Sequence, residues 1–119
     1  MAYRRLCEGD YRIMRVIWEN EPINSTALVK LCEAQLGWKK STTYTMLRKM
    51  CEKGFAKNEN SIVTSLVSHE WVRANESEFI VDQAFEGSLP RFLVAFLGEK
   101  KISAEEAEEL KKLIDSHMD

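Results

Sequence analysis

The sequence predicts a mainly α-helical fold that carries one small β-hairpin. Three observations support this. Apolar residues recur every three or four positions along the first half of the chain. Two short runs with β-branched residues then flank a polar turn. Three further helical segments, each preceded by a capping serine, complete the chain. We therefore expect an N-terminal domain over residues 1–68 and a helical module over residues 69–119.

The first helix is expected over residues 9–20. Tyr11, Met14 and Trp18 fall on one of its faces, as in an amphipathic helix. Asp10 is the expected N-cap. Because Trp18 shares the apolar stripe, we expect it to plug the core rather than to hold a ligand.

The second helix is expected from a cap at Asn24 to Leu36, after an extended link at Pro22. Gly37 should end it in the left-handed conformation. Its apolar stripe consists of Leu28, Leu31, Cys32 and Leu36.

The most informative stretch covers residues 38–54, where basic residues crowd a predicted third helix. Its apolar side is formed by Leu47, Met50 and Cys51. Its polar side is formed by Thr42, Thr45, Arg48 or Lys49, and Glu52. Such a helix suits the DNA major groove, because phosphates favour cations and helix N-termini while hydroxyls can reach base edges. The alternative is an ordinary surface helix with a solvated charged face.

The net charge of −2 does not exclude a DNA-binding protein, because the charge is unevenly distributed. Residues 1–74 hold 12 Lys and Arg against 8 Asp and Glu, a balance of +4. Residues 75–119 hold 5 against 11, a balance of −6. Salt screens charges beyond about 8–10 Å, so a phosphate would sense mainly the local basic segment.

Gly54 should end the third helix, and residues 55–58 and 61–67 should pair around a turn at 58–60. A helix, a short turn with glycine and a basic helix form a helix-turn-helix, and the hairpin adds a wing. We expect Lys57, at the base of this wing, to matter more than its tip.

The tail should form helices over 69–86, over 89–98 and beyond 103, capped by Ser68, Ser88 and Ser103. So small a unit seldom forms a stable core alone, yet it is rich in apolar side chains. We expect two copies to share one core; the alternative is a tail that folds back on the N-terminal domain. The residues expected at the dimer interface are Phe79, Ile80, Phe85, Leu89, Leu93, Phe96, Leu97, Leu110 and Ile114.

Several other functions are not expected. The three widely spaced cysteines indicate buried, reduced thiols, and the two histidines stand apart from them. We therefore expect no enzyme, metal site, cofactor or small-molecule ligand. Neither a signal peptide nor a transmembrane run is present, which favours a cytoplasmic protein.

Taken in order, these motifs resemble the penicillinase repressor family, which includes the methicillin-resistance and copper-transport repressors. The matching positions are Trp18, residues 36–38, 41–50 and 53–55, and, in the tail, residues 87–89, Phe96 and 102–114. The resemblance covers about residues 8–115.

The resemblance implies a bacterial homodimeric repressor, whose winged helices read a palindromic operator in double-stranded DNA. Its base-reading positions match Ser41, Thr42, Tyr44 and Thr45. The basic positions expected at the DNA backbone are Lys39, Lys40, Arg48, Lys49, Lys53 and Lys57. The alternative is a winged helix that binds an acidic protein partner instead of specific DNA.

Two departures bear on induction. The copper-responsive branch ends in paired C-x-C motifs, whereas this tail has no cysteine, so copper sensing is not expected. In the β-lactam-responsive branch, a membrane sensor protease cuts an Asn-Phe bond. The matching bond is Ala95–Phe96, which keeps the phenylalanine but not the asparagine, so the sequence itself does not support cleavage there.

Overall fold

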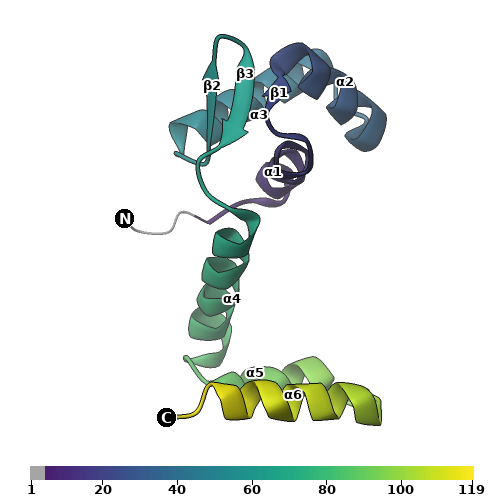
Figure 1. Cartoon of the computed structure of the whole chain (residues 1–119), viewed down its shortest axis with the longest axis vertical. Helices are drawn as coiled ribbons and strands as arrows, with labels where there is room; N and C mark the ends of the chain where they lie inside the picture. Colours follow the sequence, from purple (N-terminus) through teal and green to yellow (C-terminus); the bar gives the residue numbers. More distant parts are fainter. Residues whose placement is uncertain (1–4) are drawn as a thin grey trace. The chain divides into compact units, whose positions relative to one another are not determined.

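A computed structural model describes residues 5–119, so the first four residues of the predicted N-terminal domain lie outside it. The elements are α1 (Glu8–Asn20), β1 (Ile23–Asn24), α2 (Ser25–Leu36), α3 (Lys40–Glu52), β2 (Ala56–Glu59), β3 (Ile62–Ser65), α4 (His69–Phe85), α5 (Leu89–Leu97) and α6 (Ala104–Ser116) (Figure 1). The three strands form one antiparallel sheet in the order β1-β3-β2. This arrangement of helices and a small sheet confirms the predicted mainly α fold with a winged helix.

The chain divides into two compact units inside α4, one ending at Phe79 and the other beginning at Ile80. The first half of α4 belongs to the N-terminal unit, where Val72 is fully buried. The division into domains over residues 1–68 and 69–119 stays a prediction.

The core of the N-terminal unit is built from the predicted apolar stripes of the first three helices, closed by the sheet and α4. Its fully buried apolar members are Ile13, Met14, Ile17, Leu28, Cys32, Met50, Val63 and Val72. Burying each larger side chain stabilises the fold by roughly 1.5–3 kcal/mol. Trp18 packs against this core as expected, and its indole Nε1 donates a hydrogen bond to the Val67 carbonyl at 3.0 Å.

The helix caps are partly as predicted. Asn24 caps α2 by accepting a hydrogen bond from the backbone N–H of Thr26 at 2.8 Å, and Gly37 ends α2 at a φ of 69°. The prediction that Asp10 is an N-cap was wrong. Helix α1 begins at Glu8 after Cys7, which leaves Asp10 inside the first turn and fully buried.

The hairpin is present, but its turn lies further along the chain than predicted. Strand β2 runs to Glu59, and Asn60 and Ser61 take the turn with φ values of 52° and 65°. Two consecutive left-handed residues are typical of a type I′ turn, whose twist suits a β-hairpin. The predicted extended link after α1 also contains a strand, β1, in which Ile23 pairs with Val63 of β3.

In the C-terminal unit, the predicted caps are found. Ser88 and Ser103 accept hydrogen bonds from the N–H groups of Arg91 and Glu106, at 3.2 and 3.1 Å. No residue of α5 or α6 is buried. The exposed large apolar side chains of this unit are Ile80, Leu89, Val94, Phe96, Ile102, Leu110, Leu113, Ile114 and Met118.

Candidate nucleic-acid interface

Helix α3 presents one apolar and one polar side, as its sequence predicts. Leu47 and Met50 are buried against α1 and α2, together with Thr43, whose burial the pattern did not reveal. On the other side, Thr42, Thr45 and Arg48 are exposed. The polar residues of this helix therefore face outward from the N-terminal unit.

The four predicted base-reading residues do not all lie alike. Ser41, Thr42 and Thr45 are exposed and, with Met46, line one shallow hollow on α3. Tyr44 is half-buried. Three short polar side chains thus share a continuous surface at the N-terminal half of the helix.

The predicted cations fall into two groups. Lys39, Lys40 and Arg48 are exposed at or along α3, and Lys57 is exposed on β2, where its ammonium lies 3.7 Å from the Glu59 carboxylate. The second group, Lys49 and Lys53, does not point freely into solvent. Both side chains contact a carboxylate of α1.

That carboxylate belongs to Asp10, which has no exposed surface. Its Oδ2 accepts hydrogen bonds from the Lys53 ammonium at 2.9 Å and from the Cys7 N–H at 3.1 Å. The Lys49 ammonium lies 3.2 Å from Oδ1. Burial by itself would raise the pKa of Asp10, but the hydrogen bonds from Lys53, Cys7 and Lys49 outweigh it and hold the pKa below its ordinary value. Sequence spacing could not reveal this contact across 43 residues.

A second contact brings the first turn of α1 against α3. A β-carbon added to Gly9 would lie 3.3 Å from the methyl carbon of Met46, so the two helices approach closely here. Because Met46 also lines the hollow with Thr42 and Thr45, the first turn of α1 borders the predicted base-reading surface.

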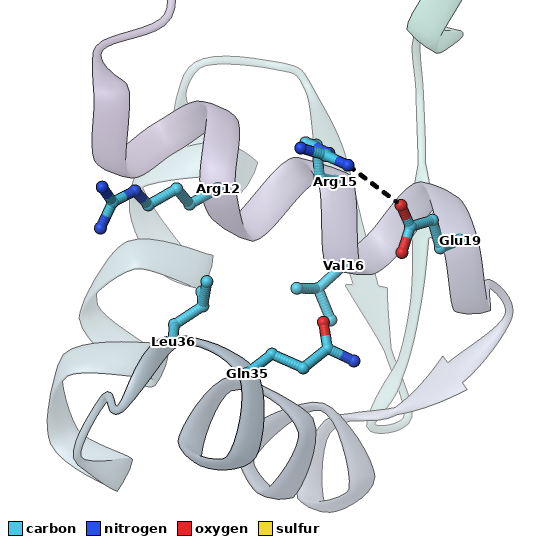
Figure 2. Close-up of a pocket in the computed structure, with 6 residues that line it drawn as sticks. All are labelled: Arg12, Arg15, Val16, Glu19, Gln35 and Leu36. Carbon is cyan, nitrogen blue, oxygen red and sulfur yellow. Dashed lines mark ion pairs between the residues drawn. The ribbon is translucent and has the colours of Figure 1, made fainter.

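A second hollow with basic side chains lies on α1, away from the polar side of α3. A pocket of about 200 Å³ lies between α1 and α2, and the Arg15 guanidinium on its wall lies 3.7 Å from the Glu19 carboxylate. Figure 2 shows the residues that line this pocket. Arg12, on the same pocket, is paired with Glu8 at 2.6 Å. Both arginines are therefore already neutralised by carboxylates of their own helix.

The cysteines are free, but only Cys32 is fully buried, and Cys7 is exposed, contrary to the expectation of buried thiols. Burial raises the pKa of Cys32 and of Cys51, which keeps both thiols protonated and weakly nucleophilic. Within residues 5–119, no group of three or more His, Cys, Asp or Glu side chains could hold a metal ion. In the same range, no helix is both long and apolar enough to cross a membrane.

The profile of the family described as "Penicillinase repressor" matches residues 6–116, nearly the whole chain. The chain belongs to the penicillinase repressor family. This confirms the resemblance seen in the order of its motifs. The penicillinase repressor family is one of DNA-binding transcriptional repressors, not of enzymes.

Individual relatives agree with this assignment at low identity. The methicillin resistance regulatory protein MecI of Mammaliicoccus sciuri is 21% identical over 114 residues, which cover 92% of this chain and 93% of the relative. The penicillinase repressor of Bacillus licheniformis is 21% identical over 118 residues, covering 95% and 91%. An uncharacterised 16.5 kDa protein of Latilactobacillus sakei is 31% identical, but only over 51 residues, 43% of this chain and 35% of its own.

Proposed function

We propose that this repressor acts as a cytoplasmic homodimer and reads a palindromic operator by placing one α3 of each copy in the major groove. The observation that carries the proposal is the division of α3 into two sides. Thr43, Leu47 and Met50 fix the helix in the core, while short polar side chains and cations face outward. The names of the relatives, a penicillinase repressor and a regulator of methicillin resistance, support the same class of function.

Within this interface, the roles divide by chemistry. The hydroxyls of Ser41, Thr42 and Thr45 are short enough to discriminate base edges, with Tyr44 beside them. The phosphates would be bound by the exposed Lys39, Lys40, Arg48 and Lys57. The sequence also predicted phosphate contacts for Lys49 and Lys53, but both ammonium groups lie at Asp10, and each would have to leave it to reach a phosphate.

The dimer would form through the C-terminal unit. Val94 and Phe96 on α5 are 74% and 60% exposed, and Leu113 and Ile114 on α6 are also more than half exposed. Large apolar side chains are costly to leave in water when they gather in a patch, so we expect these residues to be covered by a second copy. Five of the predicted interface residues are exposed: Ile80, Leu89, Phe96, Leu110 and Ile114. Two others, Leu93 and Leu97, are half-buried. The ring of Phe85 packs edge-on against Phe92, and the guanidinium of Arg5 lies over the ring of Phe79.

Induction by a membrane sensor protease stays a prediction drawn only from the family resemblance. The bond that matches the family's cleavage position, Ala95–Phe96, lies in the last turn of α5, and both residues are exposed. A protease would have to unwind this turn to reach the bond.

The test uses the full chain and fragments selected from random duplex DNA. We expect the selected fragments to share an inverted repeat, and the affinity to fall steeply as salt rises, because binding releases counterions from the phosphates. Sedimentation at micromolar concentration should show a dimer, and Phe96→Ser should shift it towards the monomer. Equal affinity for all duplexes, or none, would instead favour a winged helix that binds a protein partner.

A further inference from the structure

Asp10 lies where α1 meets the C-terminal half of α3. Among the ion pairs of residues 5–119, Asp10 is the carboxylate that pairs with the two lysines at this end of the helix, Lys49 and Lys53. The two lysines follow Thr42 and Met46 on one stripe of the helix, at spacings of three or four residues. The pair therefore lies next to the surface proposed to meet DNA.

We propose that Asp10 limits the affinity of this protein for duplex DNA of any sequence, because it holds the ammonium groups of Lys49 and Lys53 away from DNA phosphates. This inference rests on the proposed function. Phosphates carry no sequence information, so every cation that reaches them strengthens binding to all duplexes alike. Withholding two cations therefore lowers binding to operator and non-operator DNA by the same factor, while the hydroxyls of Thr42 and Thr45 remain free to read bases.

The carboxylate is built to keep its charge and its partners. It sits in the first turn of α1, where the helix dipole favours an anion, and the Cys7 N–H donates to it. A buried carboxylate that loses its cations is strongly disfavoured. Each lysine that turns to a phosphate therefore leaves a penalty behind at Asp10, whatever the DNA sequence.

The lysines themselves are not locked in the interior. The Lys49 side chain is 42% exposed and that of Lys53 is 22% exposed, so both ammonium groups border solvent. Rotation of the side chain is enough to free them once the attraction to Asp10 is removed. The ion pairs with Asp10 thus fix where two ammonium groups lie, and breaking them requires no change in the backbone.

The test compares Asp10→Asn with the unchanged chain, because asparagine keeps the shape and can still accept from the Cys7 N–H. We expect affinity for operator and non-operator duplex alike to rise by roughly five- to tenfold per released lysine at about 0.1 M salt, and the salt slope to steepen by about 0.9 for each. The ratio of operator to non-operator affinity should stay the same, because phosphate contacts carry no sequence information. Asp115→Asn replaces an exposed aspartate on α6, makes the same change in net charge, and should leave both the affinity and the salt slope unchanged.

Two further substitutions, Lys49→Gln and Lys53→Gln, show which lysine causes the change in salt slope. Each is made singly, in the unchanged chain and in the Asp10→Asn variant. In the unchanged chain, neither should alter the salt slope; in the Asp10→Asn variant, each should remove about 0.9 of it. If Asp10→Asn fails to fold, the two single lysine variants still decide. A shallower slope in either, with Asp10 intact, means that the lysine already contacts phosphate and overturns the inference.

Failure of the proposed function looks different. In that case the unchanged chain itself shows no preference for an inverted repeat and no salt-dependent binding. If instead the unchanged chain prefers its operator, but Asp10→Asn weakens binding to all duplexes equally without changing the slope, Asp10 only supports α3 structurally and the inference is wrong.

Discussion

The imidazole of His69 stacks on the indole of Trp18, with ring centroids 4.3 Å apart and planes inclined by 11°. His69 is the first residue of α4, and Trp18 lies near the end of α1. The Tyr11 hydroxyl shares a hydrogen bond with His69 Nε2. An ionisable ring therefore packs between the first residue of α4 and α1.

This ring should make the stability of the fold depend on pH. Burial, together with the nearby Arg73, lowers the pKa of His69 against the opposing effect of Glu70. In the unfolded chain its pKa is about 6.5. As pH falls below that value, the unfolded chain binds a proton before the folded one, so the free energy of unfolding should decrease until the lowered pKa is reached. Urea unfolding at fixed protein concentration between about pH 7.5 and 5 measures the decrease.

His69→Gln should flatten this dependence, because glutamine does not titrate. His117→Gln is the matched control, since His117 is exposed at the end of α6, and it should keep the pH dependence of the unchanged chain. Equal slopes for the unchanged chain and His69→Gln would show that another group is responsible.

Much of this fold could be predicted because its signals are local. Apolar periodicity located the helices, and a side chain such as Asn24 or Ser103 that caps its own helix acts within three residues. The turn of the hairpin was misplaced because Asn60 and Ser61 are less distinctive than a glycine-containing pair. Strand β1 was missed because two residues give no alternation, and only the pairing with β3 defines it.

The candidate site shows the same limit. The exposed hydroxyl surface of α3 follows from helical spacing, which places Thr42 and Thr45 away from Leu47. The role of Asp10 does not follow from the sequence, because an aspartate near the start of a helix is most often an N-cap. Its partners come from another part of the chain, and only tertiary packing brings them together.

The core makes a prediction of magnitude. Leu28→Ala removes a fully buried side chain and should lower the free energy of unfolding by about 2–5 kcal/mol, as expected for a cavity in a packed interior. Leu66→Ala is the control, because Leu66 is 53% exposed, and it should change stability by no more than about 0.5 kcal/mol. Similar losses in both variants by urea unfolding would mean that Leu28 is not in the core.

The hairpin turn predicts a stabilising change. Ser61 is held at a φ of 65°. This left-handed conformation is sterically strained for a residue with a side chain, but not for glycine. Ser61→Gly creates the Asn-Gly pair preferred in type I′ turns and should raise the free energy of unfolding by about 0.5–1 kcal/mol. A higher midpoint of thermal unfolding would show this gain. Ser77→Gly, on the exposed surface of α4, should do the opposite, since glycine weakens a helix. A loss of stability in Ser61→Gly would contradict the turn geometry.

The proposed division of roles at α3 can be separated by two substitutions. Thr45→Val keeps the shape of the side chain but removes the hydroxyl that would reach a base. It should lower the preference for operator over other duplexes by about 1–3 kcal/mol and leave the salt slope as it was. Lys57→Gln removes a cation from the wing and should weaken binding to every duplex alike, with a slope smaller by about 0.9.

Mobility shifts on the operator and on a scrambled duplex, over a range of salt, measure both quantities. Lys111→Gln, on the exposed surface of α6, makes the same chemical change as Lys57→Gln and should affect neither. Because base contacts alter the ratio of affinities and phosphate contacts alter the slope, the two variants should move different observables. If Thr45→Val and Lys57→Gln both lower affinity for all duplexes equally, Thr45 does not read a base and the surface around it binds DNA only by charge.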